Sequence, residues 1–311
     1  MKNVFIRIDD RKYITLWEEI LILGRRILIK VSIEKLSIKR LDDTVIVLVP
    51  KYKHYNIWTK NRIAKQINKI LEKNKFENCL YSENVKFFHK YIENKNIKTE
   101  KILMKNLILG ILEYICNINK INTELENIHI FVNQYSKNNI KIIENLCKKF
   151  KTVNIITENF KYFKRLENSL YNEGILITLS NNKRKSAKNA KIIVNMDFEK
   201  EKIEQYNVNM NSIFINLTNE KLLFEKFFRG IMINNIELIL NEDFIYYINE
   251  VFGDVDIKMF LEILLRDKDC EDVKNILKKY DGKIASLVGV RGIIPDCEFY
   301  MKTLDKQLKL I

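Results

Sequence analysis

The sequence contains little glycine and almost no proline. It has 8 Gly and 2 Pro among 311 residues, which leaves little material for disordered linkers. By contrast, 47% of its residues are hydrophobic, including 17 Phe and 14 Tyr. A chain of this length can bury about 75% of its unfolded surface. The composition therefore predicts an ordered globular protein that is long enough for two domains.

The sequence also lacks the motifs of common metal and hydrolase sites. It contains no Cys-x-x-Cys pair, no His-Glu-x-x-His and no Gly-x-Ser-x-Gly, so neither a zinc site nor a nucleophile elbow is indicated. Its five cysteines are scattered and odd in number, as is typical of reduced thiols. We predict no metal site and identify no catalytic residue.

No segment has the pattern of a targeting signal or a membrane span. The N-terminus lacks the apolar core and small-residue cleavage site of a secretory signal. The strongest apolar run, Ile102–Ile118, is interrupted by Lys105, Asn106 and Glu113, whereas a membrane span needs about 20 mostly apolar residues. We therefore expect a cytoplasmic protein with no membrane partner.

Five short apolar runs alternate with helix-like polar stretches over residues 128–217. The runs are Ile128–Val132, Val153–Thr157, Ile175–Leu179, Ile192–Asn195 and Ile213–Leu217. Because parallel strands need crossover connections, this alternation is typical of a doubly wound sheet. Apolar runs without polar alternation also suit strands that are covered on both faces. We predict an α/β fold with a Rossmann-like, mainly parallel sheet and helices on both faces.

Further elements flank this sheet on both sides. Residues 1–50 predict strands with a hairpin and residues 58–118 predict helices, so we expect an N-terminal α+β domain over residues 1–120. The second predicted domain, residues 121–311, joins the Rossmann-like sheet to a helical C-terminal segment. Within it, we expect a very short crossover at Lys185–Asn189, either a single helical turn or a loop, and a late strand at Ile284–Val288.

The strand and helix pattern over residues 100–220 resembles the NAD(P)-binding domains of shikimate dehydrogenase and glutamyl-tRNA reductase. It is also similar to an uncharacterised family of low-GC bacterial proteins. The resemblance implies that Asn133 and Ser136 lie in the turn that holds the pyrophosphate. It implies that Glu158, after the second strand, is the acidic ribose ligand, and that Asn195 ends the strand near the nicotinamide. These four are the candidate cofactor-binding residues.

The turn that would hold the pyrophosphate contains no glycine. Glycine lets the backbone approach the phosphates and lets the helix pack closely on the strand, but the run Asn133–Asn138 reads Asn-Gln-Tyr-Ser-Lys-Asn. A helix N-terminus can still bind an anion without glycine. We therefore predict no bound cofactor, with NAD(P) binding as the disfavoured alternative.

A cluster of cations follows the third apolar run. Lys183, Arg184, Lys185 and Lys188 should lie at the carboxyl edge of the sheet, where ligands of open α/β sheets bind. Such a loop could hold a phosphate or a nucleic-acid backbone, but a solvated charged loop explains the same residues. These four are the candidate anion-binding residues.

The charge is unevenly distributed along the chain. Residues 1–150 hold 29 Lys+Arg against 16 Asp+Glu, a net of +13, while residues 151–311 hold 25 against 24, a net of +1. A basic N-terminal half indicates a nucleic-acid partner. The abundance of Lys over Arg is also what a low-GC composition produces, and Arg is the better bidentate phosphate ligand. Nucleic acid, another anionic ligand and a protein partner all stay open.

Three functional hypotheses follow from these residues. The first is a non-catalytic binding or regulatory protein built on a degenerate Rossmann-like fold, with an unknown ligand. The second is a divergent NAD(P)-dependent oxidoreductase, and the third and weakest is a nucleic-acid-binding protein that uses the basic N-terminal half. The missing glycines favour the first, so the sequence argues against an enzyme without excluding one.

Overall fold

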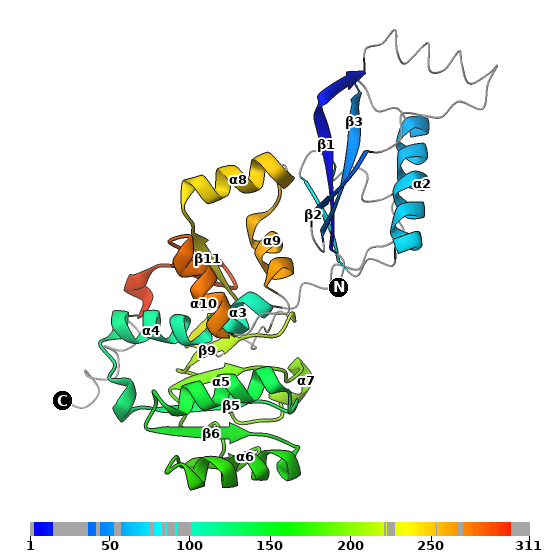
Figure 1. Cartoon of the computed structure of the whole chain (residues 1–311). Helices are drawn as coiled ribbons and strands as arrows, with labels where there is room; N and C mark the ends of the chain where they lie inside the picture. The colour runs from blue at the N-terminus through cyan, green and yellow to red at the C-terminus, as the bar shows by residue number, and fades with distance from the viewer. Residues whose placement is uncertain are drawn as a thin grey trace. The chain divides into compact units, whose positions relative to one another are not determined.

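The protein forms two compact units. One contains Met1–Thr99 and Glu242–Leu264, and the other contains Glu100–Asn241 and Leu265–Ile311. A computed structural model (Figure 1) describes residues 3–14, 37–41, 44–52, 57–74, 78–82, 85, 91, 101–220, 222, 228–252, 254–265 and 270–299.

The second unit is built on a six-stranded sheet. Its strands are β5 (Asn127–Phe131), β6 (Thr152–Ile156), β7 (Ile177–Ser180), β8 (Ile192–Asn195), β9 (Ile213–Asn216) and β10 (Ile231–Ile233). Every neighbouring pair is parallel, and the order is β7-β6-β5-β8-β9-β10. Numbered from β5, this is the order 3-2-1-4-5-6 of a Rossmann fold. The predicted mainly parallel, Rossmann-like sheet is confirmed.

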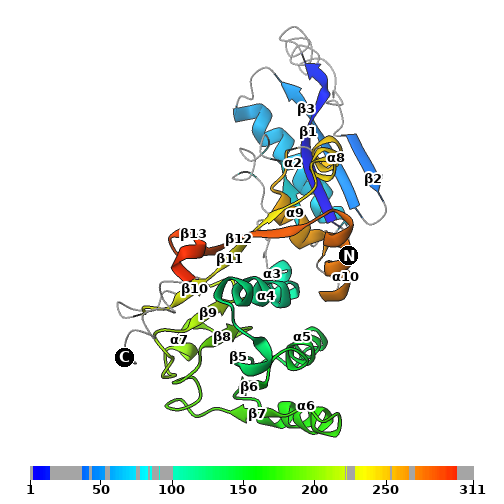
Figure 2. The ribbon, with the colours of Figure 1, turned by 90° about the vertical axis from the view of Figure 1, so that its left-hand side faces the viewer.

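The two faces of this sheet are covered differently. In Figure 2, α4 (Ile108–Asn119), α5 (Lys137–Cys147) and α6 (Phe160–Asn172) lie on one face, and the single-turn helix α7 (Lys200–Ile203) lies on the other. Irregular crossovers complete the second face. The short crossover expected at 185–189, as one helical turn or a loop, is a run of turns over residues 183–189. Ala187 within this run and Ala190 directly after it are buried in an apolar cluster with Phe131 and Phe198.

The boundary between the units differs from the predicted division at residue 120. The long apolar segment forms two helices, α3 (Ile102–Asn106) and α4, with Leu107 between them. Because α4 contacts α5 and β12, both helices belong to the second unit, ahead of the short 3-10 helix η2 (Thr123–Leu125). The boundary therefore precedes the long apolar segment.

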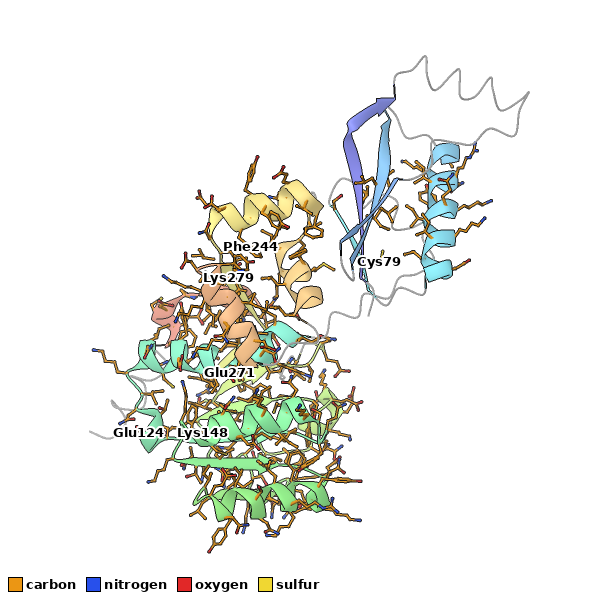
Figure 3. All side chains as sticks on the ribbon, viewed as in Figure 1. Cys79, Glu124, Lys148, Phe244, Glu271 and Lys279 are labelled. Carbon is orange, nitrogen blue, oxygen red and sulfur yellow. The ribbon has the colours of Figure 1, made fainter. Side chains whose placement is uncertain are left out.

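A small antiparallel sheet completes the second unit. It has the order β11-β12-β13, formed by β11 (Asn235–Ile239), β12 (Lys283–Gly289) and β13 (Gly292–Ile294). The late strand predicted from residues 284–288 is thus confirmed. Before it lies α10 (Cys270–Lys279), which carries Glu271 in its first turn and Lys279 in its last (Figure 3). These charges suit the helix dipole.

The first unit has a four-stranded sheet of its own. Its order is β2-β3-β1-β4, and its elements are β1 (Asn3–Ile14), β2 (Ser37–Leu41), β3 (Thr44–Tyr52), α2 (Ile57–Asn74), β4 (Asn78–Tyr81), α8 (Glu242–Phe252) and α9 (Ile257–Leu264). The strands β2 and β3 form an antiparallel hairpin, and α8 and α9 contact β1 and β4. The α+β character is as predicted. Part of the predicted helical stretch, residues 86–90 and 92–100, lies outside the described residues.

Two searches over the described residues found nothing. No helix there is long and apolar enough to cross a membrane. Within the same residues, no group of three or more His, Cys, Asp or Glu side chains could hold a metal ion.

Candidate functional site

The carboxyl ends of β5 and β8 lie side by side, because these strands are neighbours at the point where the strand order reverses. Open α/β sheets bind their ligands at this switch point. The turn after β5 leads directly into α5, whose N-cap is Ser136. Its hydroxyl oxygen accepts a hydrogen bond from the Asn139 N–H at 3.2 Å, so the candidate residue Ser136 caps the helix.

The carboxylate of Asp197, two residues beyond β8, binds the turn after β5. Its Oδ1 accepts the backbone N–H of Asn133 at 2.7 Å, and its Oδ2 accepts that of Gln134 at 2.8 Å. The Asn139 amide also donates to Oδ2, at 3.5 Å. In a dinucleotide-binding protein this first turn holds the pyrophosphate. Here an anion of the chain itself occupies its backbone donors.

Burial of the Asp197 carboxyl raises its pKa, although the two backbone N–H donors and the nearby Lys105 and Lys202 act in the opposite direction. Desolvation disfavours the charged form of an acid, whereas hydrogen bonds to the carboxylate favour it. The net direction shows that burial is the larger effect. The Asp197 carboxyl therefore lies in an environment that is partly closed to water.

Asn133 joins the ends of β5 and β6. Its Oδ1 accepts the Glu158 N–H at 2.8 Å and the Thr157 hydroxyl at 3.2 Å, and its Nδ2 donates to Glu158 Oε2 at 3.2 Å. The same Oε2 accepts a hydrogen bond from Lys202 Nζ at 3.0 Å. The structure thus brings the candidates Asn133 and Glu158 together, and the carboxylate expected to bind a ribose already has two partners.

The candidate Asn195 lies inside the protein, with 0% of its surface exposed. Its Nδ2 donates to the Phe198 carbonyl and to Asn216 Oδ1, both at 3.0 Å, and its Oδ1 accepts the Phe198 N–H at 2.9 Å. Asn216 in turn donates to Asn234 Oδ1 at 3.2 Å. This row of buried amides links the ends of β8, β9 and β10, so Asn195 presents no polar group to a ligand.

The basic loop lies on the surface. Lys183, Arg184, Lys185 and Lys188 are all exposed, and Asn182 Oδ1 organises the turn by accepting the N–H groups of Arg184 and Lys185, both at 3.1 Å. Lys183 donates to Gln205 Oε1. The other three cations form no ion pair with a residue that the structure describes.

Sequence reasoning missed Asp197, which is central to this site. A single acid after a strand carries no motif, and its role becomes visible only when β8 is placed next to β5. The Rossmann strand order itself predicts that neighbourhood. Two sequence features together could therefore have identified Asp197. It is the first acidic residue after the fourth strand of the Rossmann-like sheet, and the turn after the first strand contains no glycine.

No family model and no curated protein matches the chain. Solved structures with some likeness include ornithine carbamoyltransferase from Pyrococcus furiosus (10% identity, 69% of this chain and 72% of that one, TM-score 0.25). A second is ornithine transcarbamoylase from Giardia lamblia, with 6% identity over 86% of each chain and a TM-score of 0.30. A third is L-tryptophan dehydrogenase from Nostoc punctiforme, with 10% identity over 89% of this chain and 87% of that one and a TM-score of 0.31. The strand order β7-β6-β5-β8-β9-β10 defines the fold.

Proposed function

We propose that this protein is a non-catalytic binding or regulatory protein, built on a Rossmann-like domain that no longer binds NAD(P). One observation carries the proposal: the Asp197 carboxylate accepts the N–H groups of Asn133 and Gln134. The same proposal includes descent from NAD(P)-binding domains of the shikimate dehydrogenase and glutamyl-tRNA reductase type. The cytoplasmic location stays a prediction.

The energetic reason is competition between anions. A pyrophosphate at this turn would have to displace a carboxylate that is covalently part of the chain, and hydrogen bonds to charged groups contribute about 1.5–3 kcal/mol each. It would also place its own negative charge beside Asp197. The ribose would meet a second obstacle, because Glu158 already pairs with Lys202. These contacts support a site filled by the protein's own side chains.

The test is a calorimetric titration of the whole chain with NAD and with NADP at about millimolar concentration, where a weak complex would still give heat. We expect no saturable binding. A micromolar dissociation constant for either nucleotide would overturn the proposal and place the divergent oxidoreductase first.

The basic loop supports a second, more limited proposal. Three exposed cations, Arg184, Lys185 and Lys188, form no ion pair with a described residue, and clustered cations without partners attract phosphate groups. We propose this loop as the contact for an anionic partner, nucleic acid included.

A further inference from the structure

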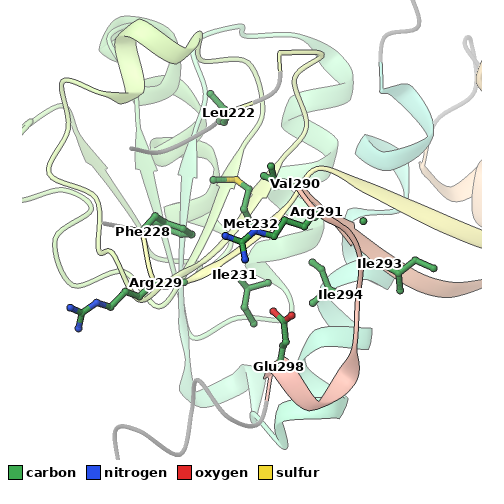
Figure 4. A pocket seen from close by; sticks show the side chains of 13 residues that line it. Leu222, Phe228, Arg229, Ile231, Met232, Val290, Arg291, Ile293, Ile294 and Glu298 are labelled. Carbon is green, nitrogen blue, oxygen red and sulfur yellow. The ribbon is translucent and has the colours of Figure 1, made fainter. Parts of the chain in front are cut away.

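A pocket of about 500 Å³ lies between the start of β10 and the hairpin that joins β12 to β13. Figure 4 shows it from close by. Its described lining comes from the second unit alone, from Leu222, residues 228–232, residues 289–294 and Glu298. A volume of this size falls within the range of small-molecule sites, which span about 300–1,000 Å³.

Glycines fix the shape of this pocket. Three of the eight glycines in the chain line it, namely Gly230, Gly289 and Gly292. A Cβ on Gly230 would lie 2.0 Å from the Ser212 carbonyl oxygen, and one on Gly289 would lie 3.0 Å from the Met232 oxygen. Gly292 has a φ of +115°, which L-residues rarely adopt. Close backbone packing therefore holds the hairpin beside β10.

Part of the pocket lining is apolar, and some of that apolar surface is exposed. Ile231, Met232 and Ile294 are buried, whereas Val290 exposes 52% of its surface. Covering apolar surface is favourable by about 25 cal/mol per Å². A ligand with an apolar body would gain this free energy without any rearrangement of the strands.

One arginine reaches over the apolar walls. Arg291 lies in the two-residue turn between the paired Gly289 and Gly292, and its side chain extends across the pocket towards Met232, while Arg229 points away (Figure 4). Arg291 forms no ion pair with any residue that the structure describes. Guanidinium groups bind carboxylates through two parallel hydrogen bonds.

We propose that this pocket binds a small monoanionic ligand that joins a carboxylate to an apolar body, with the carboxylate on Arg291. A phosphate dianion suits the pocket less well, because one arginine reaches in and Glu298 contributes a negative charge to the same lining. The proposal gives a ligand class to the binding protein proposed above, and in that sense it rests on the proposed function.

The experiment uses the full chain and three probes, with binding followed by calorimetry and by ligand-detected NMR. Phenylacetate carries both features, phenylacetamide has the same shape without the charge, and acetate has the carboxylate without the apolar body. We expect millimolar binding of phenylacetate, the scale for a ligand of about ten heavy atoms, and at least about tenfold weaker binding of the other two.

Two variants locate the binding. Arg291→Gln should weaken phenylacetate binding by about tenfold, down to the level of phenylacetamide, and Val290→Asn should weaken it through the apolar part of the lining. Both side chains are exposed, so folding should be preserved. Lys278→Gln is the matched control, because Lys278 lines a second groove of about 460 Å³ with an apolar floor that includes Leu277.

Three results would overturn the proposal. They are an absence of phenylacetate binding up to about 20 mM, equal binding by Arg291→Gln and the unsubstituted protein, and a loss of binding in Lys278→Gln alone. Failure here is distinguishable from failure of the proposed function. An empty pocket would leave the NAD(P) titration unchanged, and NAD(P) binding would overturn the proposed function without bearing on Arg291.

Discussion

Two regions of the Rossmann-like unit invert the usual distribution of glycine and charge. The turn after β5, where this fold normally binds its cofactor, has no glycine, and Asp197 occupies its donors. The pocket beside β10 has three glycines and an arginine that lacks an ion pair with any described residue. Strand order therefore locates the usual cofactor position, between β5 and β8, but the side chains there decide whether it is open to a ligand.

The largest effect on stability is expected when the glycine on which the pocket depends is replaced. Gly230→Ala places a Cβ 2.0 Å from the Ser212 carbonyl oxygen, so the backbone before β10 must shift. We expect a loss of about 3 kcal/mol or more of unfolding free energy, measured by urea denaturation.

The matched control is Gly110→Ala in α4. Its new Cβ would meet Ile284 Cδ1 at 3.5 Å, an ordinary contact, and alanine is favoured over glycine inside a helix by about 0.5–1 kcal/mol. We expect no loss of stability there. Equal effects of the two substitutions would show that the close approach at Gly230 imposes no constraint.

The second test opens the region that is filled. Asp197→Ala frees the N–H groups of Asn133 and Gln134 in the turn between β5 and α5, and we expect about 1–3 kcal/mol of destabilisation. Because the variant no longer buries a charge, the loss of unfolding free energy should lie towards the lower end of this range. Inorganic phosphate should then bind about tenfold more tightly than to the unsubstituted protein, as calorimetry would show.

The pH dependence of Asp197→Ala has a defined sign. Since the folded-state pKa of Asp197 is raised above 3.8, the folded protein holds its proton to a higher pH than the unfolded chain does. Unfolding free energy therefore falls as pH rises from 3.8 through the folded-state pKa, and the variant should lack this slope.

The control is Glu199→Ala, because Glu199 is an exposed neighbour of Asp197 whose side chain makes no capping hydrogen bond. A pH dependence of stability in Asp197→Ala that matches that of this control would mean that burial does not raise the pKa of the Asp197 carboxyl.

The main features of the sheet were predictable from the sequence, and the site was not. β5 to β9 are short and rich in apolar residues, and the fully buried β8, residues 192–195, is the clearest of these runs. β10 was missed because it has only three residues, followed by Asn234 and Asn235. Asp197 was missed because its partners, Asn133 and Gln134, are more than 60 positions away in the chain. Similarly, Asn195 has the expected place at a strand end, but its amide turns inward to Asn216.

The smallest effect on stability is expected at the basic loop. Substitutions there test whether exposed cationic side chains of the Rossmann-like unit bind a ligand. The triple variant Lys183→Glu, Arg184→Glu and Lys185→Glu should keep its unfolding free energy within about 0.5 kcal/mol, because exposed substitutions rarely change more. We expect its binding to a single-stranded oligothymidylate to weaken and the salt dependence of that binding to become less steep, since fewer phosphates are neutralised.

The control reverses three scattered exposed lysines, Lys148, Lys161 and Lys278, which changes the net charge by the same amount. Greater weakening in the loop variant would assign the contact to this loop. Equal weakening in both variants would instead attribute binding to overall charge and would contradict the proposed anionic contact.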